Sequence, residues 1–324
     1  MNRQPALGRR VLVTGAAGSI GSRLCSALLA AGCRVAGVDD FFSGLRGNIE
    51  PFAGDPRFFF HERDVCESGL LAELSALHGP FDAVLHMAAV VSAPWSVENP
   101  EYTDAVNRAA TLALHEEARR LGVGAFVFAG SAAEYGLPLD GPAREDMAGE
   151  PQSPYGLSKL LSTKAIEESG YGCALRLFNI YGTTEGNPGP YDGVVRRFLD
   201  AALRGEPFTV CGDGGQTRDF VYVDDVVRAL LHASGASGGE PLSGVFNYGT
   251  GRATSVAELA GIVAAVSGRR LEIISLPERP GDLRHSRADM SRSRITSLPM
   301  PETRLEDGLR AAWERLREKD GRSG

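Results

Sequence analysis

The fold class is decided by residues Thr14–Gly21, which read TGAAGSIG. They follow a short apolar run, Arg10–Thr14, that is typical of a buried strand, and they open a segment with the spacing of a helix. Glycines between a strand and a helix permit a tight turn, a close backbone approach to a pyrophosphate and close helix packing; here they are Gly15, Gly18 and Gly21. The helix begins with Ser19 and Ile20, and its first N–H groups are expected to face the phosphates. The stretch therefore predicts a dinucleotide-binding turn.

A carboxylate stands where the next strand is predicted to end. The apolar run 34–38 is followed by Asp39 and Asp40. A carboxylate at this place accepts hydrogen bonds from the hydroxyls of an adenosine ribose and repels a 2′-phosphate. Asp39 therefore favours NAD over NADP as the cofactor, and Asp40 can share the role.

Strands and helices are predicted to alternate through the first half of the chain. Further apolar runs are 57–60, 81–86, 124–129 and 173–178, and segments with helical spacing are 19–31, 98–121 and 154–168. Continuous apolar runs indicate strands that are covered on both faces. We predict an α/β fold, with a Rossmann-type doubly wound parallel sheet in residues 1–178 and returning segments near 217–250. Residues 179–216 and 251–324 are predicted to form a smaller α/β domain that binds the substrate.

Composition excludes several classes of partner. The 324 residues carry a formal net charge of −7, whereas nucleic acids and anionic membranes both select a basic face. The five cysteines form no CxxC pair, so neither a disulfide framework nor a metal site is predicted. The sequence shows no signal-peptide pattern and no apolar run of about 18 residues, and we expect a soluble, cytoplasmic protein.

A tyrosine and a lysine four residues apart give the chain a candidate base. Tyr155 and Lys159 lie on one face of the predicted helix 154–168. A free phenol has a pKa of about 10, and a neighbouring ammonium favours the phenolate. A phenolate can take a proton from a sugar hydroxyl while hydride leaves the same carbon. Ser131 follows the predicted strand 124–129, at the sheet edge where α/β proteins place their sites. Together with the glycine turn, Ser131, Tyr155 and Lys159 are predicted to form a catalytic set.

These motifs resemble those of the extended short-chain dehydrogenase/reductase family, in particular its NAD-dependent nucleotide-sugar epimerase/dehydratase branch. The resemblance covers nearly the whole chain. It implies that Ser131 and Tyr155 hold the reacting sugar oxygen and that Lys159 binds the nicotinamide ribose. The further cofactor-binding residues that it implies are Asp64, Val65, Ala88, Ala89 and Asn107, the last being the structural asparagine customary in this fold.

Three C-terminal stretches resemble the sugar-nucleotide contacts of this branch. They are RLFNIYG at 176–182, GDGGQTRDFVYVDD at 212–225, which is close to the version in UDP-sugar 4-epimerases, and RPGD at 279–282. Arginines suit this role because a guanidinium is always charged and forks onto phosphate oxygens. The implied substrate-binding residues are Asn179, Arg218, Arg279, Asp282 and Ser286. The resemblance also implies a homodimer through the helices near Glu98–Leu121 and Pro154–Glu168.

The predicted activity is reversible 4-epimerisation of a UDP-hexose (UDP-GlcNAc/GalNAc, UDP-Glc/Gal or both) through a 4-keto sugar. Dehydratases of this branch place an Asp-Glu pair after the catalytic hydroxyl, and decarboxylases place a Glu at the second of these positions. This chain has Ala132 and Ala133 there, which disfavours both reactions. Glu134, one place displaced, is either structural or an acid. The small Ser286 at the gatekeeper position leaves room for an N-acetyl group.

Two alternatives stay open. One is another nucleotide-sugar reaction that begins with C4 oxidation, namely dehydration, decarboxylation or net oxidoreduction. The other is a non-catalytic protein that binds NAD or a sugar nucleotide, although such a protein needs no phenolate.

Overall fold

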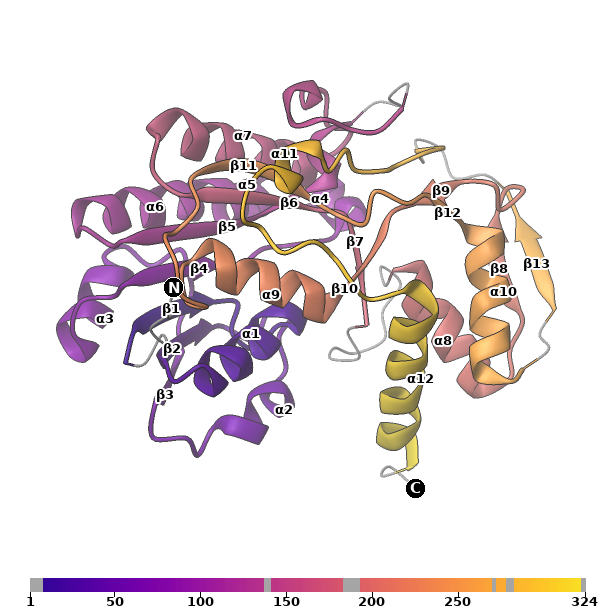
Figure 1. Cartoon of the computed structure of the whole chain (residues 1–324), viewed down its shortest axis with the longest axis horizontal. Coiled ribbons are helices and arrows are strands. Elements are labelled where there is room, and N and C mark those ends of the chain that lie inside the picture. The colour runs from indigo at the N-terminus through magenta and orange to yellow at the C-terminus, as the bar shows by residue number, and fades with distance from the viewer. Residues whose placement is uncertain (1–7, 137–140, 183–192, 270–271, 278–282, 322–324) are drawn as a thin grey trace.

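The computed structural model of the chain describes residues 8–136, 141–182, 193–269, 272–277 and 283–321 (Figure 1). At its centre lies a seven-stranded parallel sheet with the order β11-β6-β5-β4-β1-β2-β3. Its strands are β1 (Arg10–Thr14), β2 (Arg34–Asp39), β3 (Phe58–Glu62), β4 (Ala83–His86), β5 (Ala125–Ser131), β6 (Cys173–Leu177) and β11 (Gly244–Tyr248). The predicted Rossmann-type fold is confirmed. The order reverses between β1 and β4, and ligands of such sheets bind outside the carboxyl ends of the strands at this switch point.

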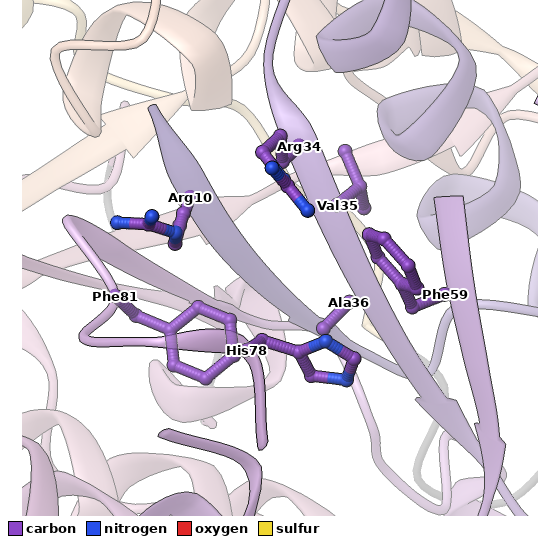
Figure 2. Close-up of a pocket in the computed structure, with 7 residues that line it drawn as sticks. All are labelled: Arg10, Arg34, Val35, Ala36, Phe59, His78 and Phe81. Carbon is purple, nitrogen blue, oxygen red and sulfur yellow. The ribbon is translucent and has the colours of Figure 1, made fainter. Parts of the chain in front are cut away.

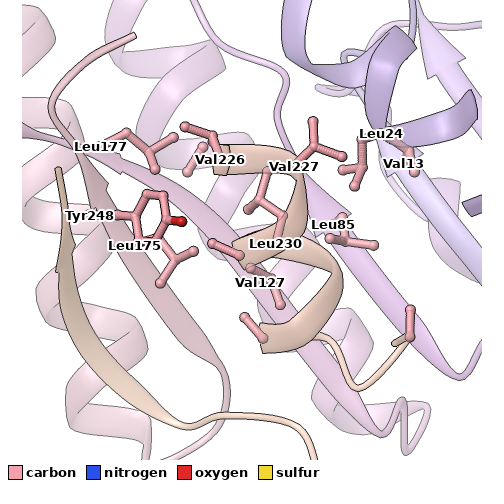
Figure 3. Packing of buried hydrophobic residues seen from close by; sticks show 14 of the residues in the cluster. Val13, Leu24, Leu85, Val127, Leu175, Leu177, Val226, Val227, Leu230 and Tyr248 are labelled. Atoms are coloured by element: carbon pink, nitrogen blue, oxygen red, sulfur yellow. The ribbon is translucent and has the colours of Figure 1, made fainter. Parts of the chain in front are cut away.

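Helices cover both faces of the sheet because its strands alternate apolar side chains between two cores. Val11 and Val13 belong to one core, and Leu12 belongs to the other. The first core lies under α1 (Ser19–Ala30) and α9 (Val223–Ala233). The second lies under α3 (Leu70–His78), α6 (Ala110–Arg120) and α7 (Pro154–Ser169). Figure 3 shows the first core, where Leu24 of α1 and Leu230 of α9 pack over strand residues. Each such buried side chain contributes about 1.5–3 kcal/mol.

The helix predicted over 98–121 is interrupted. α4 (Ala93–Glu98) ends at Asn99, α5 (Pro100–Asp104) follows, and a wider, π-type turn over Ala105–Ala109 leads into α6. Pro100 causes the first break, because it has no backbone N–H and its ring clashes with a continuing helix. The predicted helix is therefore present from Pro100 to Arg120 with a wider turn inside it, and only its predicted start at residue 98 is wrong.

A separate apolar core lies beside the sheet, at the right of Figure 1. Its helices are α8 (Val194–Arg204), α10 (Val256–Ser267) and α12 (Leu305–Gly321). Three two-stranded sheets accompany them: β7 (Asn179–Tyr181) with β10 (Phe220–Tyr222), β8 (Phe208–Cys211) with β13 (Ile273–Leu276), and β9 (Thr217–Arg218) with β12 (Thr254–Ser255). The remaining short helices are α2 (Arg46–Ile49) and α11 (Ser291–Arg294), with 3₁₀ turns at Glu50–Phe52, Ala132–Glu134 and Glu145–Met147.

Polar contacts join the two parts. The fully buried carboxylate of Asp219 accepts hydrogen bonds from the backbone N–H groups of Thr250, Gly251 and Ala288 at 2.7, 2.9 and 3.1 Å. These bonds tie the start of β10 to the segment after β11 and to the approach to α11. Within the described ranges, no helix is both long enough and apolar enough to cross a membrane.

Candidate active site

The glycine turn has the predicted geometry at the carboxyl end of β1. Gly15 has a φ of +68°, which glycine adopts readily, and Gly18 is the residue that precedes α1. A Cβ at Gly15 would lie 2.7 Å from the backbone nitrogen of Ala88, and a Cβ at Gly21 would lie 2.0 Å from the carbonyl oxygen of Gly15. Gly21 thus lets the helix pack closely against the turn that follows β1.

Asp39 ends β2 and faces the glycine turn. Its Oδ2 accepts a hydrogen bond from the backbone N–H of Ala17 at 2.9 Å, and its Oδ1 accepts one from Phe41 at 2.8 Å. The residue is only 8% exposed, and burial raises the pKa of its carboxyl group. Each carboxylate oxygen keeps a lone pair with which to accept a ribose hydroxyl. Asp40 is exposed and accepts from the N–H of Phe42 at 3.0 Å.

The other predicted cofactor residues lie at the carboxyl ends of the strands, where sheets of this kind bind a ligand in a crevice, with one exception. The structure places Ser19 and Ile20 at the start of α1, Asp64 and Val65 after β3, and Ala88 and Ala89 after β4. Asn107 is fully buried, accepts from the N–H of Val90 at 2.8 Å and donates to the carbonyl of Val90 at 2.9 Å. It therefore acts by holding the loop after β4, as the structural asparagine that the resemblance implies.

The predicted catalytic side chains meet at the carboxyl end of β5. Ser131 ends β5, Tyr155 lies in the first turn of α7, and the Ser131 side chain lies close enough to the phenol to lower its pKa. Lys159 lies one turn further along α7. Its Nζ donates to the carbonyl oxygen of Ala129 at 2.8 Å and lies 4.6 Å from the ring centre of Phe128.

Two further residues fix the position of Tyr155. Ser96 in α4 accepts a hydrogen bond from the backbone N–H of Tyr155 at 3.1 Å. Gly156 lets α7 approach the turn after β5, since a Cβ there would lie 2.6 Å from the carbonyl oxygen of Ala133. Nothing in the sequence marks Ser96, because its partner is far along the chain. Gly156 stands inside the Tyr-x-x-x-Lys motif, where its lack of a side chain is a readable signal.

Burial dominates the protonation of the tyrosine–lysine pair. Burial raises the pKa of the Tyr155 phenol, the Ser131 hydrogen bond opposes the rise, and the negative charge of Glu134 adds to it. Burial lowers the pKa of Lys159 to about 8, because the residue is only 2% exposed. The sequence predicted that the ammonium would favour the phenolate. In the structure the opposing effect comes from Ser131, since Lys159 is turned toward Ala129.

Glu134 is a supporting residue. It is fully buried, and its Oε1 accepts from the backbone N–H of Ser131 at 2.8 Å and from Thr163 Oγ1 at 3.0 Å. Its Oε2 accepts from Arg176 Nε at 2.6 Å. The carboxylate therefore joins β5, α7 and β6 directly behind Ser131. Of the two roles that the sequence left open, structural residue or acid, the geometry favours the structural one.

Three of the five predicted substrate residues lie in the described chain, and their backbones meet beside the separate core of α8, α10 and α12. Asn179 begins β7, which pairs with β10, and its side chain is exposed. Arg218 ends β9, and its Nη1 donates to the carbonyl oxygen of Leu283 at 2.7 Å. The N–H of Ser286 donates to the carbonyl oxygen of the residue before Arg218 at 3.1 Å. Arg279 and Asp282 lie outside the described residues.

A pocket at the opposite edge of the sheet is separate from this site. Figure 2 shows that it lies at the amino ends of the strands, where its lining residues are Arg10, Arg34, Val35, Ala36, Phe59, His78 and Phe81. The glycine turn, Asp39 and Ser131 all lie at the carboxyl ends. The pocket therefore takes no part in the candidate active site.

A serine, a tyrosine and a lysine that meet at the end of β5, with a glycine turn and a carboxylate suited to a dinucleotide at neighbouring strands, define a Rossmann-fold enzyme of the extended short-chain dehydrogenase/reductase class. The sequence profile described as "NAD dependent epimerase/dehydratase family" matches residues 11–249. The chain belongs to this family.

Its relatives are similar along nearly their whole length. The UDP-glucose 4-epimerase of Mycolicibacterium smegmatis is 37% identical over 319 residues, which cover 96% of this chain and 99% of that protein. The UDP-N-acetylglucosamine 4-epimerase of Methanobrevibacter ruminantium, solved with UDP-N-acetylmuramic acid, superposes with a TM-score of 0.89 at 30% identity and covers 97% of this chain and 99% of its own. The UDP-glucose 4-epimerase of Thermus thermophilus, solved with NAD, superposes with a TM-score of 0.83 at 33% identity. The match covers 95% of this chain and 99% of that chain.

Proposed function

We propose that this chain is an NAD-dependent UDP-sugar 4-epimerase. The observation that carries the proposal is the meeting of Ser131, Tyr155 and Lys159 at the carboxyl end of β5, next to the switch point. The residues around the switch point fit NAD. Side chains at Gly15 and Gly21 would collide with backbone atoms, so the turn needs glycine there. Gly18, directly before α1, has no side chain to keep a pyrophosphate from the first N–H groups of the helix, and Asp39 presents lone pairs for the ribose.

The chemistry divides between the cofactor and the chain. When bound, NAD⁺ would supply the hydride acceptor for sugar C4 and the donor that returns the hydride to the opposite face, so no cofactor would be consumed. Ser131 Oγ holds the 4-oxygen of the sugar, and Tyr155 Oη takes the proton from the 4-hydroxyl and later gives it back. Lys159 binds the nicotinamide ribose through its ammonium. Its positive charge, together with that of the nicotinamide, then offsets the burial that raises the pKa of Tyr155.

The substrate class includes N-acetylated sugars. Asn179, Arg218 and Ser286 lie beside the separate core of α8, α10 and α12, and Arg279 and Asp282 complete the proposed contacts to the nucleotide. Ser286 is small and half-buried, and a relative of similar fold acts on UDP-N-acetylglucosamine by its printed name. We therefore propose UDP-N-acetylglucosamine as a substrate beside UDP-glucose.

The organisation of the molecule follows the same proposal. Residues 1–178 with the returns near 217–250 bind NAD, and residues 179–216 and 251–324 bind the sugar nucleotide. We propose a cytoplasmic homodimer whose interface contains α7, because Leu157 and Leu161 on this helix are 47% and 40% exposed. Light scattering of wild type and Leu161→Glu tests the interface, and a monomeric wild type would overturn it.

The first experiment is incubation of the purified protein with UDP-N-acetylglucosamine and UDP-glucose separately, without added NAD, followed by NMR of the sugar protons. Appearance of the galacto epimer is expected with both. Tyr155→Phe should lower the rate by about 10²–10⁴-fold while bound NAD is retained. If neither sugar is epimerised even after NAD⁺ is restored, the proposal fails, and a keto, unsaturated or decarboxylated product from a wider panel would identify another reaction.

A further inference from the structure

Three aromatic side chains connect the chain segments on either side of the glycine turn. Phe42 follows β2, Trp95 lies in α4 and Tyr102 lies in α5. The ring centres are 5.6 Å apart for Phe42 and Trp95, 5.5 Å for Phe42 and Tyr102, and 5.6 Å for Trp95 and Tyr102. All three separations lie in the range in which aromatic pairs attract one another. We call Phe42, Trp95 and Tyr102 the aromatic bridge.

The aromatic bridge crosses the switch point. β1 lies between β2 and β4 in the sheet, so the loop after β2 and the helices after β4 flank the glycine turn. Both flanks also contact the turn directly. The N–H of Leu45 donates to the carbonyl oxygen of Ala17 at 3.1 Å, and the backbone of Ala88 leaves no room for a Cβ at Gly15. A dinucleotide seated on the turn is therefore flanked by segments that the aromatic bridge joins to each other.

The loop backbone is strained where it presents Phe42. Phe41 has a φ of +59°, and no other non-glycine residue in the described ranges has a positive φ. Its ring packs against Phe60 at 5.2 Å and under the guanidinium of Arg46 at 4.2 Å, whereas Phe42 turns to α4 and stays 54% exposed. Such a conformation costs about 1–3 kcal/mol and persists where the surrounding contacts or a function require it. The positive φ of Phe41 lets its ring pack against Phe60 and Arg46 while the ring of Phe42 packs against Trp95 of α4.

The aromatic bridge extends from the adenosine side of the crevice to the catalytic tyrosine. Tyr102 lies near the carboxylates of Asp40 and Asp64, and burial with these negative charges raises the pKa of its phenol. At the other end, Trp95 is the neighbour of Ser96, which holds the backbone N–H of Tyr155 at 3.1 Å. The exposed faces of Phe42 and Tyr102 offer apolar area for a bound ligand to bury.

We propose that the aromatic bridge retains the dinucleotide, so that its rings must part before NAD leaves. The proposal rests on the proposed function, because it takes the ligand of the crevice to be NAD. It also agrees with the chemistry. An epimerase returns the hydride to the sugar in each turnover, so slow cofactor exchange does not limit its turnover rate. A net oxidoreductase must release the cofactor in every turnover.

The test is the rate at which bound NAD⁺ exchanges with an excess of fluorescent etheno-NAD⁺ in the full-length protein. Phe42→Ala and Trp95→Ala should each release NAD⁺ about tenfold faster than wild type or more. Tyr102→Phe keeps the ring and should stay within about twofold. The matched control is Leu77→Ala, which truncates an apolar residue that is 67% exposed on α3.

The outcomes separate the two proposals. Exchange within twofold of wild type in both alanine variants would overturn the aromatic bridge while leaving the epimerase proposal intact. A wild type that binds no NAD⁺ overturns both. Thermal unfolding of each variant checks its fold, and Trp95→Phe replaces Trp95→Ala if the latter does not fold; the smaller ring should then give an intermediate rate, and an unchanged rate counts against the proposal.

Discussion

Replacing Glu134 by glutamine tests the buried ion pair behind the candidate active site. Glu134 is fully buried, and the Arg176 side chain is 3% exposed. A glutamine keeps the shape but removes the charge, and one end of its amide becomes a donor. In one orientation the amide NH₂ faces the Nε–H of Arg176, and in the other it faces the backbone N–H of Ser131. Two donors then face each other, so at least one hydrogen bond is lost. A buried guanidinium is then left without a counter-charge. Breaking a buried pair from one side costs about 3–5 kcal/mol.

The assay is guanidinium-induced unfolding of Glu134→Gln, Arg176→Met and the double variant, followed by circular dichroism. Each single variant should lower the free energy of unfolding by about 3–5 kcal/mol, and the double variant should lose less than the two together, because both desolvated charges are gone. Glu116→Gln is the control. Its ion pair with Arg119 has side chains 60% and 54% exposed, so its removal should cost less than about 1 kcal/mol.

Two results would refute this reasoning. One is a loss below about 1 kcal/mol in Glu134→Gln, which is the value of an exposed pair. The other is a double variant whose loss equals the sum of the single losses, since independent sites add and coupled ones do not.

Three further predictions follow from the same structure. Gly21→Ala places a Cβ 2.0 Å from the carbonyl oxygen of Gly15, so NAD content and the unfolding temperature should both fall, whereas Gly47→Ala meets nothing within 4 Å and should change neither. Burial lowers the pKa of His86 to about 3 in the folded chain. As the pH falls below the pKa of His86 in the unfolded chain, the unfolded chain takes up the proton first, and the free energy of unfolding decreases. Unfolding experiments should show a loss of about 3 kcal/mol between pH 7 and pH 4.5 in wild type that is smaller in His86→Asn, and an equal pH dependence would contradict this. Ser286→Tyr should lower turnover of UDP-N-acetylglucosamine by about tenfold or more while UDP-glucose turnover persists, and equal losses by NMR would remove the gatekeeper role.

The sequence predicted what depends on local order along the chain. The glycine turn, Asp39 after the next strand and the Tyr-x-x-x-Lys spacing are all short-range patterns, and the structure places them at one edge of the sheet. Pro100 is the first residue of the observed helix, two residues after the start that the helical spacing predicted.

Contacts between distant segments were beyond such reasoning. The role of Glu134 depends on Arg176, which is 42 residues further along, and the position of Tyr155 depends on Ser96, 59 residues earlier. The aromatic bridge likewise needs the sheet order, because only that order brings the segments after β2 and β4 to either side of β1.

The place of β11 at the rim of the sheet has a consequence for how the chain is made. β6 ends at Leu177, and the strand that covers its outer edge begins only at Gly244. While a ribosome adds the intervening residues, the backbone N–H and C=O groups along that edge of β6 have no partner, and such an edge invites pairing with other chains. Helix α9, which shields the adjoining apolar face, arrives in the same interval. A fragment that stops at residue 178 is therefore expected to aggregate, even though that residue closes the first cofactor-binding segment.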